Sequence, residues 1–213
     1  MALREPSALE HETHDPDVRL MLQVRDGDAM AFESLVVRYQ NRVINLMRHL
    51  TGRSDLAEDL SQEVFLRVYR ARENYKPGAK FTTWLFTIAG NVASNARRSM
   101  ARRREVNLEG RESGPLGGSP LEQLVLAASG QMPARQLDKS EMRQIVQLAI
   151  EALNERQRMA VMLSKFEGMC YEDIAEVMET SPQAIKSLLS RARAALREVL
   201  QPYFREGARP PAL

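Results

Sequence analysis

One segment of the sequence combines residue types that could bind an unpaired nucleic acid strand: KFTTWLFTIAGNVASNARRSMARRR, residues 80–104. It contains the only tryptophan of the chain, Trp84, followed by Asn91, Asn95 and Arg98 at spacings of seven, four and three residues. These spacings place the four side chains on one face of a helix. An indole can stack on a base, asparagine amides can pair with base edges, and arginines bind phosphates. A tryptophan at helical spacing is more often a core residue than a base platform, so the function of this face depends on the rest of the chain.

The same segment must also pack against a core. An adjacent face is apolar and is expected to be buried; it comprises Phe81, Leu85, Ile88, Val92 and Ala96. Five arginines, at positions 97, 98, 102, 103 and 104, would provide a strip of phosphate contacts. The segment is therefore expected to be a long helix with one buried face and one face for nucleic acid.

The segment SDLAEDLSQEVFLRVYRAREN, residues 54–74, offers a different chemistry. We expect a helix capped by Ser54, whose buried stripe comprises Leu56, Leu60, Val64 and Val68. Another face carries Asp55, Asp59, Gln62 and Leu66, with Glu63 beside them. A leucine within an acidic stripe suits the docking of a basic protein partner. The competing interpretation is a solvated charged face, which is the commoner meaning of such a pattern alone.

A third segment, YEDIAEVMETSPQAIKSLLSRARAAL at residues 171–196, has the layout of a DNA-binding helix-turn-helix. The first helix is expected to end near Met178, and Ala175 is small enough for the second helix to approach closely. Ser181 is expected to cap the second helix, and Pro182 suits its first position.

The second helix of this motif has two contrasting faces. Its buried stripe is expected to comprise Ile185, Leu188, Leu189, Ala192 and Leu196. The opposite face carries Gln183, Ser187 and Ser190, flanked by Lys186, Arg191 and Arg193. Short polar side chains with cations at their edges suit base contacts framed by phosphate contacts. The alternative is an ordinary helical hairpin with a solvated basic face.

The elements that position these groups are helical, because apolar residues recur at helical spacing and strand-like alternation is scarce. The expected fold is all-α, with two small helical domains joined by a flexible linker, the C-terminal domain being the helix-turn-helix. The expected boundaries are a disordered leader at 1–17, an N-terminal domain at 18–104, a linker at 105–138, a C-terminal domain at 139–200 and a tail at 201–213.

Composition excludes several other classes of protein. The 213 residues carry a formal net charge of +2, so a nucleic-acid footprint would have to be local. The sequence has no apolar run of about 18 residues, so we expect no membrane insertion. A single cysteine, Cys170, fits a cytoplasmic location, because the cytoplasm is reducing.

The sequence lacks the usual marks of a catalytic site: a placed nucleophile, a metal-binding carboxylate cluster or a phosphate-binding glycine loop. We therefore expect no catalytic residue, no cofactor and no small-molecule substrate. His11 and His14 could contribute metal ligands, but they are far from Cys170 in the sequence, so no metal site is predicted.

Three motifs, in this order and spacing, resemble those of bacterial alternative sigma factors of the extracytoplasmic-function group. They are DLAEDLSQEVFLRVYRA, FTTWLFTIAGNVASNARR and YEDIAEVMETSPQAIKSLLSRARAAL, and the resemblance covers about residues 18–200 apart from the linker. It implies a non-catalytic specificity subunit that binds core RNA polymerase, recognises the −35 and −10 promoter elements and assists promoter melting. It also implies control by an anti-sigma factor.

The resemblance further implies roles for individual residues. Those matching the helix that docks on the clamp of the largest polymerase subunit are Asp55, Glu58, Asp59, Gln62 and Leu66, with Glu63 beside them. A second group matches residues that recognise and melt the −10 element, called here the −10 reader. On the helix these are Trp84, Phe86, Asn91, Asn95 and Arg98, and in the preceding loop NYKPGAKF they are Tyr75, Lys76 and Lys80. Those matching −35 contacts are Lys186, Ser187, Ser190 and Arg191, on the same face as Gln183 and Arg193.

A stand-alone helix-turn-helix regulator with an N-terminal sensory or dimerisation domain is the main alternative. Such a regulator needs neither an acidic docking helix nor a helix with a tryptophan, two asparagines and arginines on one face. These two features favour the sigma factor.

Overall fold

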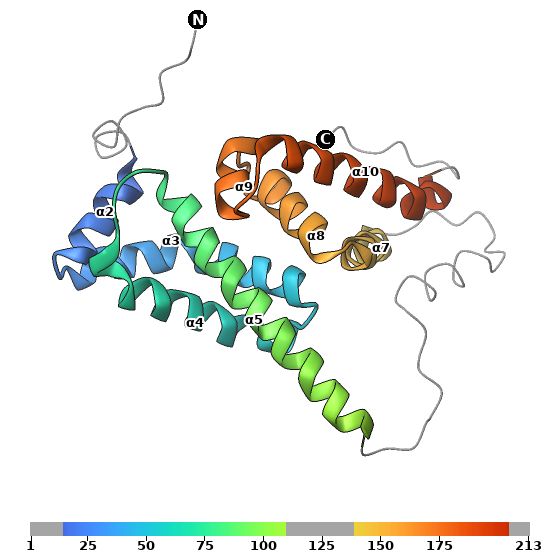
Figure 1. Cartoon of the computed structure of the whole chain (residues 1–213), viewed down its shortest axis with the longest axis horizontal. Helices are drawn as coiled ribbons and strands as arrows, with labels where there is room; N and C mark the ends of the chain where they lie inside the picture. The colour runs from blue at the N-terminus through green and yellow to red at the C-terminus, as the bar shows by residue number, and fades with distance from the viewer. Residues whose placement is uncertain (1–14, 110–138, 205–213) are drawn as a thin grey trace, which may run out of the picture.

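The computed structural model describes residues 15–109 and 139–204, and every regular element among these residues is a helix (Figure 1). These helices form two domains, which confirms the all-α, two-domain fold expected from the sequence. Most of the expected leader, linker and tail lies outside the described residues, while residues 16–17, 105–109 and 201–204 of these segments are helical.

The described part of the N-terminal domain is built around the second of its four α-helices. The helices are α2 (Pro16–Arg25), α3 (Ala29–Thr51), α4 (Ala57–Arg70) and α5 (Phe81–Glu109), with 3-10 turns η1 (Ser54–Leu56) and η2 (Arg72–Asn74) on either side of α4. α3 packs against α2, α4 and α5. Its inner face carries Leu35, Tyr39, Val43 and Leu46, each at most 2% exposed. The helical repeat of apolar residues in this segment therefore forms the core of the domain.

Aspartates fix the starts of two helices. Asp15 accepts a hydrogen bond from the amide of Asp17 at 2.9 Å and one from the amide of Phe81 at 3.4 Å, so it ties the start of α2 to the start of α5. Asp28 accepts from the first amides of α3. The prediction that Ser54 caps α4 is wrong, because Ser54 begins the η1 turn and α4 starts after it without a side-chain cap.

The C-terminal domain contains the predicted helix-turn-helix. Its elements are α7 (Lys139–Ala152), α8 (Glu155–Val161), a π-helical turn η3 (Met162–Phe166), α9 (Tyr171–Val177) and α10 (Pro182–Phe204). Glu179 turns the chain between α9 and α10 with a left-handed φ of 49°. The Ser181 hydroxyl accepts from the amide of Ala184 at 3.2 Å, and Pro182 begins α10, as predicted.

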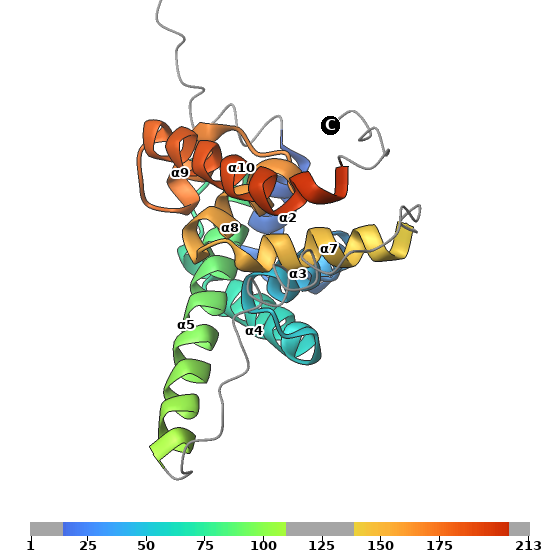
Figure 2. The ribbon, with the colours of Figure 1, turned by 90° about the vertical axis from the view of Figure 1, so that its right-hand side faces the viewer.

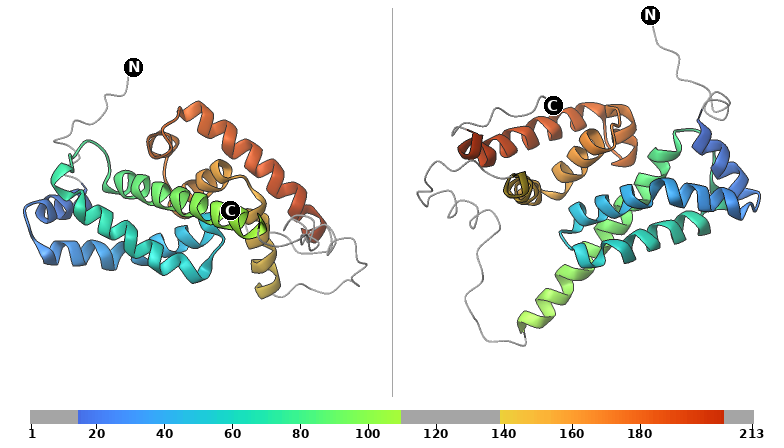
Figure 3. Two further views of the ribbon diagram at one scale, coloured as in Figure 1. Left: turned by 60° about the horizontal axis from the view of Figure 1, so that its bottom comes forward. Right: turned by 180° about the vertical axis from the view of Figure 1, so that it is seen from behind.

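The two domains are packed against each other. α9 lies on α5, while α7 and α8 lie beside α3 (Figures 2 and 3). α8 approaches α5 at Gly90, where a Cβ atom would lie 2.9 Å from Cε of Met159. A larger residue at position 90 would therefore displace the flexible end of the Met159 side chain.

Arg158 of α8 joins helix ends from both domains. Its side chain is buried and donates hydrogen bonds to the carbonyls of His49 and Leu50, at the end of α3. It also donates to the carbonyls of Glu151 and Leu153, at the end of α7. Carbonyls in the last turn of a helix lack partners within the helix, so this arginine satisfies groups that burial would otherwise leave unpaired.

α2 is held to α3 by a buried carboxylate. Asp17 is 9% exposed, accepts a hydrogen bond from the Tyr39 hydroxyl at 2.5 Å and forms an ion pair with Arg38. Burial is the larger cause that raises the pKa of Tyr39 above its usual value, and the hydrogen bond to Asp17 is the second.

The uncharged variant Asp17→Asn should lower the free energy of unfolding by about 1–3 kcal/mol, measured by chemical denaturation, because it weakens charge-assisted hydrogen bonds at a buried site.

The matched control for this prediction is Asp26→Asn, since the side chain of Asp26 is exposed and its ion pair is with the adjacent Arg25. This variant should change the free energy of unfolding by less than about 0.5 kcal/mol. Equal effects of the two substitutions would contradict the structural role of Asp17.

Candidate nucleic-acid and protein interfaces

The helix face predicted to bind an unpaired nucleic acid strand lies on one continuous helix. α5 runs without a break through Trp84, Asn91, Asn95 and Arg98, so the spacing of these residues places them on one face. The last three are exposed, and Arg98 donates a hydrogen bond to the side chain of Asn95 at 3.0 Å. The result is an exposed row of amide and guanidinium groups.

Trp84 lies at the border between this row and the core. It is partly buried, and the centroid of its ring lies 4.9 Å from that of Tyr75 and 6.2 Å from that of Phe81. These contacts fix the orientation of the indole, which reduces the conformational entropy that base stacking would cost.

Two aromatic residues assigned by resemblance to the −10 reader are in the core. Tyr75 is 2% exposed and Phe86 is fully buried, so neither ring can reach DNA as the protein is packed here. Tyr75 instead supports Trp84. Phe86 lies four residues before Gly90, on the side of α5 that packs toward the C-terminal domain, and the guanidinium carbon of Arg42 is 5.7 Å from its ring centroid.

The loop before α5 contributes two exposed lysines, Lys76 and Lys80. The ammonium group of Lys80 forms an ion pair with Asp173 of α9 at 2.7 Å, and this hydrogen bond raises the pKa of Lys80. A residue predicted to contact DNA is therefore paired with a carboxylate of the other domain.

The acidic face of α4 has the predicted exposure. Glu58, Asp59 and Gln62 are exposed, and Leu66 is 50% exposed among them. Two other carboxylates of this face are paired within the domain: Asp55 with Arg53 at 2.6 Å, and Glu63 with Arg67 at 2.7 Å. The hydrogen bond from Arg53 lowers the pKa of Asp55.

Tyr69 extends this acidic face and was missed by the sequence analysis. It is 42% exposed, lies three residues after Leu66, and packs between the ring of Phe32 and the guanidinium of Arg72. The spacing from Gln62 and Leu66 could have revealed it. An aromatic ring beside an exposed leucine adds apolar area to a protein-docking surface.

The second helix of the helix-turn-helix presents the predicted polar face. The exposed residues of that face are Gln183, Lys186, Ser187, Ser190, Arg191 and Arg193. The opposite side is buried, with Ile185 and Ala192 fully inaccessible. The hydroxyl and amide groups are therefore free of the core and framed by cations, as direct contact with base edges requires.

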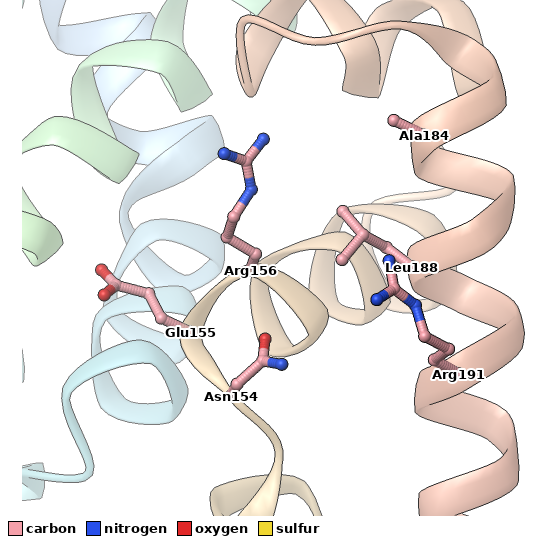
Figure 4. A pocket seen from close by; sticks show the side chains of 6 residues that line it. All are labelled: Asn154, Glu155, Arg156, Ala184, Leu188 and Arg191. Carbon is pink, nitrogen blue, oxygen red and sulfur yellow. The ribbon is translucent and has the colours of Figure 1, made fainter.

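A groove of about 490 Å³ separates this helix from the start of α8 (Figure 4). Arg156 of α8 and Arg191 of α10 both line it, together with Leu188 and Ala184. Two guanidinium groups at one groove suit phosphate oxygens. The sequence analysis missed Arg156, because only the fold brings α8 beside α10.

Two further observations bear on other chemistries. Within the described residues, no three His, Cys, Asp or Glu side chains are grouped so that they could hold a metal ion, and His11 and His14 lie outside those residues. In the same part of the chain, no helix has the length and apolar character needed to cross a membrane.

Comparison with known proteins identifies the scaffold that carries these faces. The family model "Sigma-70 region 2" matches residues 35–104, and the model "Sigma-70, region 4" matches residues 143–196. The first match covers the acidic α4 and most of α5, and the second covers the helix-turn-helix. Both are regions of RNA polymerase sigma factors.

The chain is also similar to complete sigma factors. It is 34% identical over 197 residues to the RNA polymerase sigma-H factor of Pseudomonas aeruginosa, covering 91% of this chain and 98% of that protein. It is 35% identical over 192 residues to the ECF RNA polymerase sigma-E factor of Escherichia coli, covering 89% of this chain and 96% of that protein. The chain therefore belongs to the extracytoplasmic-function group of RNA polymerase sigma factors.

Two solved structures share the fold. The sigma factor RpoE from Bartonella quintana, in complex with the anti-sigma factor NepR, superposes with a TM-score of 0.61 at 25% identity, covering 80% of this chain and 96% of that one. CnrH, in complex with the cytosolic domain of CnrY, gives a TM-score of 0.61 at 22% identity, covering 88% of this chain and 98% of that one.

The buried position of Tyr75 leads to a test. Its hydroxyl has no hydrogen-bond partner among the residues that the structure describes, and burial raises its pKa. The variant Tyr75→Phe should leave the free energy of unfolding unchanged or raise it by up to about 1 kcal/mol, because it removes a buried polar group that makes no hydrogen bond. Chemical denaturation provides the measurement.

The matched control is Tyr39→Phe, which loses the hydrogen bond to Asp17 and should lower the free energy of unfolding. A loss of stability in Tyr75→Phe as large as that in Tyr39→Phe would show that the hydroxyl of Tyr75 has a partner after all.

Proposed function

We propose that this sigma factor makes its three macromolecular contacts through three separate faces. The acidic face of α4 binds core RNA polymerase, the outer face of α5 holds the −10 strand, and the polar face of α10 reads the −35 duplex. One observation supports this division: a single helical scaffold exposes three chemically different surfaces. The proposed role needs no catalytic group and belongs to the cytoplasm, where transcription takes place.

The α4 face has the chemistry of a protein-docking site. The carboxylates of Glu58 and Asp59 lie about two helical turns before the exposed Leu66, and Tyr69 extends the apolar part. Complementary charge steers association, and the apolar residues supply contact area once the surfaces meet. The proposed partner is the clamp of the largest polymerase subunit, which would have to present basic residues around an apolar recess.

The α5 face suits a strand whose bases are unpaired. Trp84 offers a ring held in place by Tyr75, and Asn91 and Asn95 offer amides that can both donate to and accept from base edges. Stacking contributes about 1–3 kcal/mol per base in comparable single-strand sites. That energy is available only when a base has left the duplex, so it favours promoter opening without ATP.

The α10 face suits a duplex. Its hydroxyl and amide side chains can contact base edges in the major groove, while Lys186, Arg191 and Arg193 bind phosphates on either side. Arg156 adds a further cation across the groove from Arg191. Specificity for the −35 sequence would then reside mainly in Gln183, Ser187 and Ser190.

We also propose that an anti-sigma factor controls the chain. The support is the similarity to RpoE of Bartonella quintana, a sigma factor whose structure was solved with its anti-sigma factor.

The alternative function is a stand-alone regulator. Such a regulator would use α10 alone, so it would bind promoter DNA without core polymerase and would not need the exposed face of α4.

Charge reversal at Asp59 tests the docking face. The variant Asp59→Arg should bind core polymerase at least about tenfold more weakly, because a like charge would replace an opposite charge at the contact. Affinity for labelled core enzyme gives the measurement. Asp26→Arg makes the same change at an exposed position between α2 and α3, away from this face, and should bind normally. Unchanged core binding by Asp59→Arg would refute the docking assignment.

Removal of the indole tests the melting face. The variant Trp84→Ala should bind core polymerase normally yet yield about fivefold to a hundredfold less open complex, from the loss of about 1–3 kcal/mol of stacking. Permanganate reactivity of promoter thymines measures opening. Trp84→Phe keeps a ring against Tyr75 and should retain most of the activity. Equal opening by Trp84→Ala and the parent protein, at equal thermal stability, would refute the assignment.

A further inference from the structure

The groove between α8 and α10 carries two guanidinium groups that have little to neutralise them. Arg156 and Arg191 are exposed, and Figure 4 shows them on the two helices that bound the groove. Within residues 15–109 and 139–204, Arg156 has no hydrogen-bond or ion-pair partner, and Arg191 makes one long hydrogen bond, to the carbonyl of Ser187 at 3.5 Å. Both positive charges are therefore available to a ligand.

The other groups of the groove do not compensate these charges. Glu155 is the one carboxylate among the lining residues, and it pairs with Arg97 of α5 at 3.4 Å. Figure 4 shows the Glu155 side chain directed away from α10. Asn154 uses its side-chain oxygen to cap α8, and the remaining lining residues, Ala184 and Leu188, are apolar. The groove therefore suits an anion whose oxygens can accept hydrogen bonds from two guanidinium groups.

The groove lies on one flank of α10, next to its polar face. The residues of that face proposed to read bases are Gln183, Ser187 and Ser190. At about 100° per residue, Lys186 and Arg193 lie roughly 75° from the centre of this face on one flank, and Arg191 lies about as far from it on the other. Up to Arg193, α10 by itself therefore presents two cations on one flank and a single cation on the flank that borders the groove.

Arg156 adds the missing cation. A recognition helix in the major groove of a duplex has the phosphate backbone of one strand on each side. Lys186 and Arg193 can reach one backbone, and Arg191 faces the other. Because α8 packs against α10, it brings Arg156 to the flank of Arg191.

We propose that Arg156 and Arg191 together bind a phosphate of one strand of the −35 duplex, and that Arg156 is a positioning residue for α10. The inference rests on the proposed −35 role of α10. Phosphate contacts set the position of a protein on a duplex, while base contacts supply specificity. Serine side chains are short, so Ser187 and Ser190 reach base edges only if α10 is held deep and centred in the major groove. Cations on both flanks hold it there.

This role has a defined energetic signature. Loss of Arg156 should weaken binding to every −35 sequence by a similar factor, because the guanidinium contacts no base. It should also lower the dependence of affinity on salt, since each phosphate contact releases counterions from the duplex.

The test uses holoenzyme formed with saturating core polymerase. The promoter duplexes carry an uncharged methylphosphonate in place of one phosphate at a time across the −35 element. Fluorescence anisotropy measures affinity at several salt concentrations for the parent protein, Arg156→Ala, Arg191→Ala and Arg193→Ala.

Arg156→Ala should bind the unmodified promoter roughly tenfold more weakly, as expected for the loss of a charge-assisted hydrogen bond, and the slope of log affinity against log salt should fall by about one. Neutralising one phosphate, or two adjacent phosphates of one strand, should weaken binding by the parent but have little effect on Arg156→Ala. Arg191→Ala should become insensitive at the same position, whereas Arg193→Ala should become insensitive on the other strand.

Two controls separate a specific contact from general charge. Arg156→Lys keeps the charge but loses the planar guanidinium, so its affinity should fall between those of the parent and Arg156→Ala. Arg143→Ala removes the same charge from an exposed position of α7 that does not line the groove, and it should change affinity less than about twofold. Because Arg156 is exposed, its substitutions should leave thermal stability unchanged.

Three results would overturn the proposal. The first is parent-like affinity of Arg156→Ala. The second is a weaker affinity in which every phosphate still matters as it does for the parent, because that would show a general attraction instead of a contact. If no methylphosphonate in the −35 element weakens the parent, the −35 role of α10 fails and this inference fails with it. The phosphate scan of the parent thus tells failure of the proposed function apart from failure of the inference.

Discussion

The structure depends on the use of one helix, α5, for three contacts at once. One side of α5 packs on the core of the N-terminal domain, a second side receives the C-terminal domain, and the remaining surface carries the amides and guanidiniums proposed to hold DNA. At the second contact Gly90 lies against Met159, where a Cβ atom would come within 2.9 Å of Cε, the flexible end of that side chain. The two domains thus meet beside the proposed DNA-binding row of α5.

Charge is segregated across the molecule although the net charge is only +2. The cations of the domain contact lie on the N-terminal domain and their carboxylates on the C-terminal domain, while the outer face of α4 is acidic and that of α10 is polar and basic. The same Coulomb forces therefore serve two purposes. They steer each face to a partner of opposite charge, and they contribute to the contact between the two domains.

Much of the fold followed from local patterns in the sequence. Helical spacing predicted the buried faces of α5 and α10, and the Ser181–Pro182 pair predicted where α10 begins, because caps and amphipathic periods are encoded within a few residues. Three features required the tertiary structure. Phe86 is buried where α5 approaches Arg42 and the second domain, Tyr75 is buried beneath Trp84, and Arg156 reaches the groove of α10 only through the packing of α8. Each depends on residues distant in the chain, and single-segment spacing carries no information about them.

A sigma factor confers promoter specificity on RNA polymerase, and run-off transcription with purified core polymerase, with and without this protein, measures that property on genomic promoter fragments. Discrete transcripts should appear only when the protein is added, with start points that fall a fixed distance downstream of shared −35 and −10 sequences. Binding of the same fragments without core polymerase, together with no gain in initiation on any of them, would instead show a stand-alone helix-turn-helix regulator.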